Sequence, residues 1–200
     1  MGGDQVSQLW HVQDAIKRTK VLTEGHFILS SGKHSKHYMQ CAQLFQYPKE
    51  AEAAGKAIAD LFRDERIDLV VGPALGGVIV AHEVARALNV RCIFTERKEG
   101  SMQMRRGFTI KPNERILVVE DVVTTGGSVK EVLALLEAES SQIVGIGALV
   151  NRNGNQNPFA YPFKSLTAIE IESYEATDCP LCKMGIPAIK PGSRMNQESK

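Results

Sequence analysis

The residues best suited to chemistry lie together in the segment 115–128. Four apolar residues, Ile116 to Val119, precede the two acids Glu120 and Asp121, and Thr-Thr-Gly-Gly-Ser follows at 124–128. Glycines let the backbone turn tightly, so that consecutive N–H groups converge on one point. A helix beginning here would add its positive end, and the hydroxyl groups would add donors. The run 124–128 therefore predicts a cradle for a phosphate dianion.

The two acids before this cradle need a different ligand, because carboxylates repel a phosphate. Vicinal hydroxyl groups of a sugar suit Glu120 and Asp121 as hydrogen-bond donors, and a hydrated Mg²⁺ would also be drawn to them. Acids followed closely by a phosphate cradle indicate a site for a ribose 5-phosphate. The alternative is an ordinary strand–helix turn with capping Thr and Ser. The complete pattern of apolar strand, two acids, glycine-rich run and helix favours the phosphate-binding interpretation over this turn.

Two further segments could bind anions. A glycine-rich corner at 74–76 joins an apolar run to a predicted helix, and its backbone amides could hold a second anion. A plain strand–helix turn is the other interpretation of this corner. Residues 96–110 lack a clean periodicity and predict a long mobile loop, rich in cations. A solvated charged face is the common interpretation of such a run, but Arg also suits bidentate phosphate contact. The residues in question are Ala74, Leu75 and Gly76 in the corner, and Arg97, Lys98, Arg105 and Arg106 in the loop.

The elements that must position these residues alternate between strands and helices. Strands are expected at 68–72, 91–95, 116–119 and 143–150, and helices at 48–64, 76–88 and 127–137. Nearly continuous apolar strands separated by helices indicate an α/β fold, with a mostly parallel sheet covered on both faces. Ligands of such sheets bind beyond the carboxyl ends of the strands, where both anion-binding segments fall.

The ends of the chain are expected to be parts of one domain, since 200 residues fit a single domain. The first part should contain an amphipathic helix and a β-hairpin, and the last part reads as a turn-rich tail. The expected divisions are a helix and hairpin region at 1–47 (helix 6–19, β-like runs 27–29 and 38–41), a core at 48–175 and a tail at 176–200.

Composition excludes several classes of protein. A formal net charge of +1 argues against a general nucleic-acid coat or a polybasic membrane binder. The longest apolar run is short and interrupted by Gly and Pro, and the first residues do not resemble a signal peptide. Only four cysteines, in a sequence without a recognisable signal peptide, favour the reducing environment of the cytoplasm.

One pair of cysteines has the spacing of a metal or redox motif. Cys179 and Cys182 form a single CxxC, but a zinc site needs about four ligands, no second pair exists, and the five histidines show no ligand spacing. We therefore expect no dedicated metal site in the chain. A turn in the tail is the preferred interpretation, and His34 and His37 are expected on an exposed hairpin.

The segment 115–128 closely resembles the phosphoribosyl-pyrophosphate (PRPP) signature of the type I phosphoribosyltransferases. The resemblance implies that family's fold, with an N-terminal hood over a mostly parallel sheet. It also implies that the acids hold the ribose hydroxyls, that the cradle holds the 5-phosphate, and that the corner 74–76 holds pyrophosphate. Mg²⁺ would be carried mostly on the substrate phosphates. The PRPP-binding residues implied are Glu120, Asp121, Val122, Val123, Thr124, Thr125, Gly126, Gly127 and Ser128.

The hairpin region resembles that of the orotate phosphoribosyltransferases, whose pattern is Gly-x-Phe-x-Leu-x-Ser-Gly-x-x-Ser. The matching positions are Gly25, Phe27, Leu29, Ser31, Gly32 and Ser35, and the orotate contacts implied are Tyr38, Met39, Thr124 and Arg152. A guanidinium suits a planar, carboxylate-bearing pyrimidine. The resemblance implies transfer of ribose 5-phosphate from PRPP to orotate in pyrimidine biosynthesis. It also implies a homodimer in which the loop 97–107 is shared between subunits.

Some positions depart from the pattern of many orotate enzymes. Ser30 and Gly76 stand where these have Lys, and Ser101 and Gln103 stand where they have Lys and His. We expect Arg105 and Arg106 of the same loop to supply the missing charge.

Two alternatives stay open. The first is a purine phosphoribosyltransferase, against which the hairpin pattern and Arg152 argue. The second is a regulatory PRPP binder that has lost catalysis, for which the altered loop is the only support. Such a regulator needs a basic nucleic-acid face or an added DNA-binding module. The net charge of +1 argues against the first, and the length of the chain argues against the second.

Overall fold

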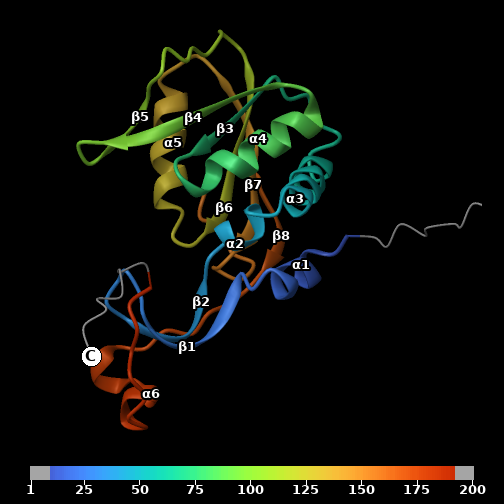
Figure 1. The fold of residues 1–200 in the computed structure, drawn as a ribbon. Helices are drawn as coiled ribbons and strands as arrows, with labels where there is room; N and C mark the ends of the chain where they lie inside the picture. Colours follow the sequence, from blue (N-terminus) through green and yellow to red (C-terminus); the bar gives the residue numbers. More distant parts are fainter. Residues whose placement is uncertain (1–9, 192–200) are drawn as a thin grey trace, which may run out of the picture.

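Residues 10–191, which the computed structural model describes, form a six-stranded sheet with helices on both faces and a smaller hairpin beside it (Figure 1). In order across the sheet, the strands are β5 (Ser101–Met104), β4 (Arg91–Lys98), β3 (Leu69–Pro73), β6 (Arg115–Val123), β7 (Gln142–Asn151) and β8 (Phe163–Ala168). Every neighbouring pair is parallel except β4 and β5, which are antiparallel. The expectation of a mostly parallel α/β sheet is confirmed.

The helices cover the two faces of this sheet unequally. Helices α3 (Pro48–Asp60) and α4 (Gly76–Leu88) lie on one face, and α5 (Gly127–Glu137) lies on the other (Figure 1). Alternate residues of the central strands divide between two buried cores. Val70, Leu117 and Val119 share a core with α3 and α4, whereas Leu69, Val71, Ile116 and Val118 share one with α5. Within residues 10–191, none of the helices is both long and apolar enough to cross a bilayer.

The start points of two helices position the predicted site. Helix α4 follows β3 and helix α5 follows β6, and both begin and end where the sequence predicts. Because β3 and β6 are adjacent and parallel, their carboxyl ends lie at the same edge of the sheet. The corner 74–76 and the run 124–128 are therefore neighbours in space.

The segment 96–110 differs from its prediction. The lack of periodicity predicts a loop, but β4 continues to Lys98 and β5 returns antiparallel from Ser101. Glu99 and Gly100 both have positive φ values, 53° and 84°, which is the turn geometry that suits a two-residue hairpin. Met102 is buried against α5, so a short strand forms here through tertiary contact. The prediction of an irregular loop is wrong for residues 96–104.

The N-terminal part forms a hairpin lobe whose two short helices pack into the core on the α3 and α4 side of the large sheet. Its elements are α1 (Val12–Arg18), β1 (Leu22–Ile28), β2 (His34–Met39) and α2 (Ala42–Phe45), and β1 and β2 make an antiparallel two-stranded sheet. The helix expected at 6–19 is present over Val12–Arg18, Trp10 and His11 are not helical, and residues 6–9 lie outside the described range.

The C-terminal segment returns to this hairpin rather than leaving the molecule. The backbone N–H of Ile28 donates to the carbonyl of Ile189 at 2.8 Å, and the N–H of Ile189 donates to His26 at 2.8 Å. A second pair of 2.8 Å bonds joins His34 and Tyr174. The short 3₁₀ helix η1 (Ala176–Asp178) and helix α6 (Pro180–Lys183) lie between these contacts, below β1 and β2 in Figure 1. The described part of the expected tail is thus attached to the hairpin.

Candidate active site

A polar pocket lies at the carboxyl end of β6. It is lined by Glu120, Val122, Val123, Thr124, Thr125, Gly126, Gly127, Ser128, Val129, Glu131 and Arg97. The structure therefore brings together every predicted PRPP-binding residue except Asp121, whose carboxylate lies against Gly76. Its lining combines the glycine-rich loop and the hydroxyl groups of Thr124, Thr125 and Ser128 with the acids Glu120 and Glu131, a combination suited to a sugar phosphate.

Gly126 shapes the floor of this pocket. Its φ of +75° is a left-handed conformation that other residues seldom adopt, and it directly precedes α5. A Cβ at this position would lie 2.6 Å from the ring of Phe159. The side-chain amide of Asn153 donates to the carbonyl of Thr124 and fixes the other end of the loop. Sequence reasoning missed Asn153 and Phe159, and the only signal nearby is the turn-forming composition of the segment 151–154.

Replacing Gly126 with Ala is expected to lower the free energy of unfolding by about 2–4 kcal/mol, because both the backbone and Phe159 must shift. Gly127→Ala is the matched control, since a Cβ there meets nothing closer than Thr125 Oγ1 at 3.8 Å. We expect the control to change stability by less than about 0.5 kcal/mol. Denaturant unfolding of both variants measures the difference, and equal stabilities would contradict this account of the loop.

The two acids lie side by side near the end of β6, where Glu120 is buried and Asp121 is half-buried. Glu120 is 8% exposed, and its Oε1 accepts a hydrogen bond from the backbone N–H of Asp121 at 3.1 Å. Burial, reinforced by the neighbouring Asp121, raises the pKa of Glu120 to about 9. Burial also raises the pKa of Asp121, whose Oδ1 accepts from the N–H of Val122 at 2.8 Å. Buried carboxyl groups of this kind need donors or a cation to stabilise their ionised forms.

The corner 74–76 lies directly beside these acids. A Cβ added to Gly76 would lie 2.7 Å from the carboxyl carbon of Asp121, so a side chain here requires Asp121 to move. This contact gives a physical reason for Gly where many orotate enzymes have Lys. The Ala74–Leu75 peptide bond is cis, and the side chain of Leu75 is 86% exposed.

The loop cations are held by carboxylates. Arg97 lines the pocket and bonds to Glu131 Oε1 at 2.6 Å, in an ion pair whose side chains are 46% and 39% exposed. Such an exposed pair is weak, so a phosphate can compete for the guanidinium. The other three cations lie on the β4–β5 hairpin or just beyond it, where Lys98 pairs with Glu99 at 3.7 Å, Arg105 with Glu96 at 3.9 Å and Arg106 with Glu96 at 2.8 Å.

The two unusual loop residues complete the hairpin turn. Ser101 Oγ donates to the carbonyl of Lys98 at 3.3 Å, and Gln103 Nε2 donates to Ser101 Oγ at 3.3 Å. Ser101 and Gln103 therefore stabilise the turn in this conformation.

Arg152 follows the last residue of β7, the strand beside β6. Its backbone N–H donates to the carbonyl of Val123 at 2.7 Å. Burial lowers the pKa of its guanidinium, and its buried Nε has no hydrogen-bond partner within residues 10–191. Burial and the charges of Asp121 and Glu120 raise the pKa of the nearby Cys41 thiol, whereas Arg152 lowers it. An unpaired guanidinium nitrogen here is suited to an anionic ligand.

The other two predicted orotate contacts lie on β2. Tyr38 is partly exposed, and its ring centroid lies 5.7 Å from that of Phe27. Met39 is 8% exposed and belongs to the main hydrophobic core. Tyr38 therefore offers more surface to a ligand than Met39 does.

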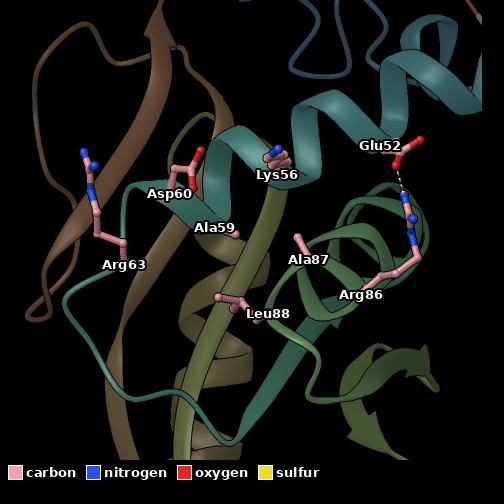
Figure 2. Close-up of a pocket in the computed structure, with 8 residues that line it drawn as sticks. All are labelled: Glu52, Lys56, Ala59, Asp60, Arg63, Arg86, Ala87 and Leu88. Atoms are coloured by element: carbon pink, nitrogen blue, oxygen red, sulfur yellow. Dashed lines mark ion pairs between the residues drawn. The ribbon is translucent and has the colours of Figure 1, made fainter.

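A second hollow lies between α3 and α4 (Figure 2). Lys56, Asp60 and Arg63 line it, and an ion pair of 3.2 Å between Arg86 and Glu52 crosses it. Arg86 is near the end of α4, about 15 Å along the helix from its first residue. This hollow is therefore separate from the pocket at the carboxyl end of the sheet.

Comparison with known proteins gives the family. Residues 40–181 match the phosphoribosyl transferase domain family. The chain is 50% identical over 183 residues to an orotate phosphoribosyltransferase of Caldanaerobacter subterraneus, covering 92% of this chain and 96% of that protein. It is also 50% identical to one of Thermotoga maritima, covering 92% and 98%.

Solved structures share the fold at lower identity. An orotate phosphoribosyltransferase from Aeropyrum pernix superposes with a TM-score of 0.67 and 22% identity, covering 79% of this chain and 93% of that one. An adenine phosphoribosyltransferase from Rhodothermus marinus gives 0.64 and 19%, covering 78% and 99%. The fold and the pocket together define a type I phosphoribosyltransferase. Within this class, the chain belongs to the orotate phosphoribosyltransferase family, as its half-identical relatives show and as the hairpin pattern predicts.

Proposed function

We propose that this protein transfers the ribose 5-phosphate group of PRPP to orotate and releases pyrophosphate, as a step of pyrimidine biosynthesis. The observation that carries the proposal is one pocket lined by both Glu120 and the glycine-rich run 124–128. The proposal is also supported by relatives that are 50% identical to this chain and are named for this activity.

The reaction is a displacement at the anomeric carbon of the ribose. The bond from this carbon to the pyrophosphate oxygen breaks, the leaving group takes the electron pair, and the ring nitrogen of orotate supplies the new bond. Glycosyl transfer of this kind has oxocarbenium character in its transition state. A deprotonated orotate nitrogen is already a nucleophile, so the protein's task is to position both substrates and to neutralise the leaving group.

Each segment of the pocket has a part in this positioning. The amides and hydroxyls of 124–128 bind the 5-phosphate, and Glu120 and Asp121 accept hydrogen bonds from the ribose hydroxyls. The corner 74–76 binds the pyrophosphate. Arg97 is placed to release Glu131 and to contact the leaving group.

The residues at this edge also fit Mg²⁺. Glu120 and Asp121 place buried carboxyl oxygens, the ligand type that Mg²⁺ prefers, beside the proposed pyrophosphate corner. When bound with PRPP, the ion would neutralise charge on the leaving pyrophosphate, and these acids would hold its water molecules. The positions of the acids at the end of β6 support this assignment.

We further propose a homodimer in which the hairpin 97–107 of one subunit serves the pocket of the other. Lys98, Arg105 and Arg106 lie outside the pocket of their own chain and are paired with acids on the hairpin. In a dimer, these cations can contact the phosphates bound in the partner's pocket without any change in the fold of their own chain. The four cysteines are free thiols, which fits a reducing compartment such as the cytoplasm.

Mixing two inactive variants tests the shared loop. One variant combines Lys98→Ala with Arg105→Ala and Arg106→Ala, the three cations that lie outside their own chain's pocket, and the other is Glu120→Gln. After random reassociation, half of the dimers are hybrids, and a loop acting across the interface restores one site in each hybrid. We expect roughly a quarter of the wild-type activity to return. Activity that stays at the level of the unmixed variants would place the loop over its own subunit's pocket.

The acceptor is tested by offering several bases with PRPP and Mg²⁺. Orotate, adenine, hypoxanthine and uracil differ in shape, but only orotate carries the carboxylate that Arg152 would bind. We expect kcat/KM for orotate to exceed that for each other base by at least about 10³-fold. Turnover of a purine in preference would refute the orotate assignment, and PRPP binding without turnover of any base would favour the regulatory alternative.

A further inference from the structure

Four side chains from opposite ends of the chain meet in the hairpin lobe. His26 of β1, His34 of β2, and Cys179 and Cys182 beside and within α6 place their ligand atoms within 4.8 Å of one another. Cys179 Sγ lies 3.5 Å from His26 Nε2, and Cys182 Sγ lies 3.3 Å from His34 Nδ1 and 3.8 Å from His26 Nε2. The two histidine nitrogens are 2.8 Å apart.

These separations are close to those of a tetrahedral zinc site. Zinc–sulfur bonds of about 2.3 Å and zinc–nitrogen bonds of about 2.05 Å place sulfur and nitrogen ligands about 3.6 Å apart. The three sulfur–nitrogen distances, 3.3, 3.5 and 3.8 Å, lie on both sides of this value. The histidine nitrogens would be about 3.3 Å apart in such a site, so they need to separate by about 0.5 Å.

The surroundings of the cluster orient its ligands. His26 Nδ1 lies 2.6 Å from the carbonyl oxygen of Ile186, which can only accept, so Nδ1 carries the proton and the lone pair of Nε2 faces the cluster. A metal-binding histidine is commonly held by such an outer hydrogen bond. His34 is fixed through its backbone by two 2.8 Å bonds to Tyr174. His26, His34 and Cys179 are 2%, 8% and 0% exposed, so water reaches them poorly.

The lobe around the cluster has little hydrophobic core of its own. Cys179 and Leu181 are buried but belong to neither of the two cores around the large sheet. A two-stranded hairpin and a four-residue helix are too small to be stable alone, and small structures of this kind depend on disulfides or metals. The cysteines are free, which leaves a metal as the available cross-link.

We propose that His26, His34, Cys179 and Cys182 bind one structural zinc ion, which fixes the C-terminal segment to the β1–β2 hairpin. Two thiolates and two imidazoles in a closed tetrahedral set are typical of structural zinc and leave no position for a substrate. Sequence spacing alone does not reveal this set of possible ligands, because the histidines lie about 150 residues from the cysteines. His34, expected on an exposed hairpin, is buried because the C-terminal segment packs against it.

Metal analysis of the full-length, untagged protein tests the site. After purification under reducing conditions with zinc in the growth medium, we expect about one zinc per chain. Cys182→Ser and His34→Ala are expected to retain less than about a tenth of this amount. Cys92→Ala and His82→Ala are the matched controls, because Cys92 lies on β4 and His82 on an exposed part of α4. Both controls are expected to keep the zinc.

Measurements on the wild-type chain keep the proposal testable if a variant fails to fold. Removing the metal with a chelator is expected to speed hydrogen exchange of the amides in 22–39 and 176–189 at least about 10-fold, without a comparable change in β6. Adding Co²⁺ should then give the visible spectrum of a tetrahedral thiolate site. Protein that holds neither zinc nor Co²⁺ would overturn the proposal, as would an intact mass showing a Cys179–Cys182 disulfide. These readouts do not depend on catalytic activity.

Discussion

Replacing Glu120 with Gln is expected to lower kcat/KM for PRPP by about 10³-fold, and at pH 8 to raise the melting temperature of the ligand-free protein. The amide has the size of the carboxylate, but it has one acceptor oxygen in place of two, and its NH₂ group can only donate. It therefore accepts hydrogen bonds from the ribose hydroxyls less well than the carboxylate does. It also carries no charge in a position that is 8% exposed. The wild-type residue is therefore expected to cost stability in the free enzyme and to contribute to binding once substrate arrives.

The pH dependence of stability separates these two effects. The pKa of Glu120 is raised to about 9 in the folded protein, mainly by burial. Between its ordinary value and about pH 9, the folded state therefore holds a proton that the unfolded state has lost. The contribution of this group to stability falls as the pH rises through that window. Glu120→Gln is expected to match the wild type near pH 4.5 and to exceed it by several degrees at pH 8.

A surface acid supplies the control. Glu65 is exposed and pairs with Arg115 at 3.1 Å, far from the pocket. Glu65→Gln is expected to leave kcat/KM and the pH slope of the melting temperature unchanged. The account of the buried acids is contradicted if Glu120→Gln retains wild-type kinetics or the wild-type pH slope.

Replacing Arg152 with Ala is expected to raise the KM for orotate by about 10²–10³-fold, with less than about a threefold change in the KM for PRPP. The buried Nε of Arg152 has no partner within the described residues, so a carboxylate that reaches this guanidinium does not compete with an existing bond to Nε. Removing the guanidinium leaves the carboxylate of orotate unpaired in a partly buried position. A change confined to one substrate distinguishes this role from a general structural one.

A conservative variant and a surface control sharpen this measurement. Arg152→Lys is expected to recover little of the lost affinity, because an ammonium cannot form the paired, planar contact of a guanidinium. Arg63→Ala removes an exposed arginine at the hollow between α3 and α4 and is expected to leave both KM values unchanged. A variant of Arg152 that loses affinity for PRPP instead of orotate would refute the assignment.

The sequence predicts which residues gather in the pocket at the end of β6, because its information is local. The apolar strand, the two acids, the glycine loop and the start of α5 are consecutive, so the pattern from 115 to 128 specifies both the elements and their order. The same reasoning predicts the bounds of α4, since glycines and a clear helical period mark it. In the segment 115–128 and in α4, the secondary structure depends on residues that are close together in the sequence.

The features that the sequence does not predict depend on contacts between distant segments. Strand β5 has four residues and forms because Met102 is buried against α5. Strand β8 lies at the edge of the sheet and has no buried residue, so its apolar pattern is weak. The positions of Phe159 against Gly126 and of Asp121 against Gly76 likewise follow from the folded chain and not from spacing.

The most direct test of the central claim measures orotate loss and pyrophosphate release in the same reaction. Orotate is followed by its ultraviolet absorbance, and pyrophosphate by a coupled phosphate assay, with PRPP and Mg²⁺ each present or omitted. The pocket geometry and the family predict one pyrophosphate released for each orotate consumed, with neither change when PRPP or Mg²⁺ is absent. Pyrophosphate release without orotate loss, or stable orotate in the complete mixture, would contradict the assigned reaction.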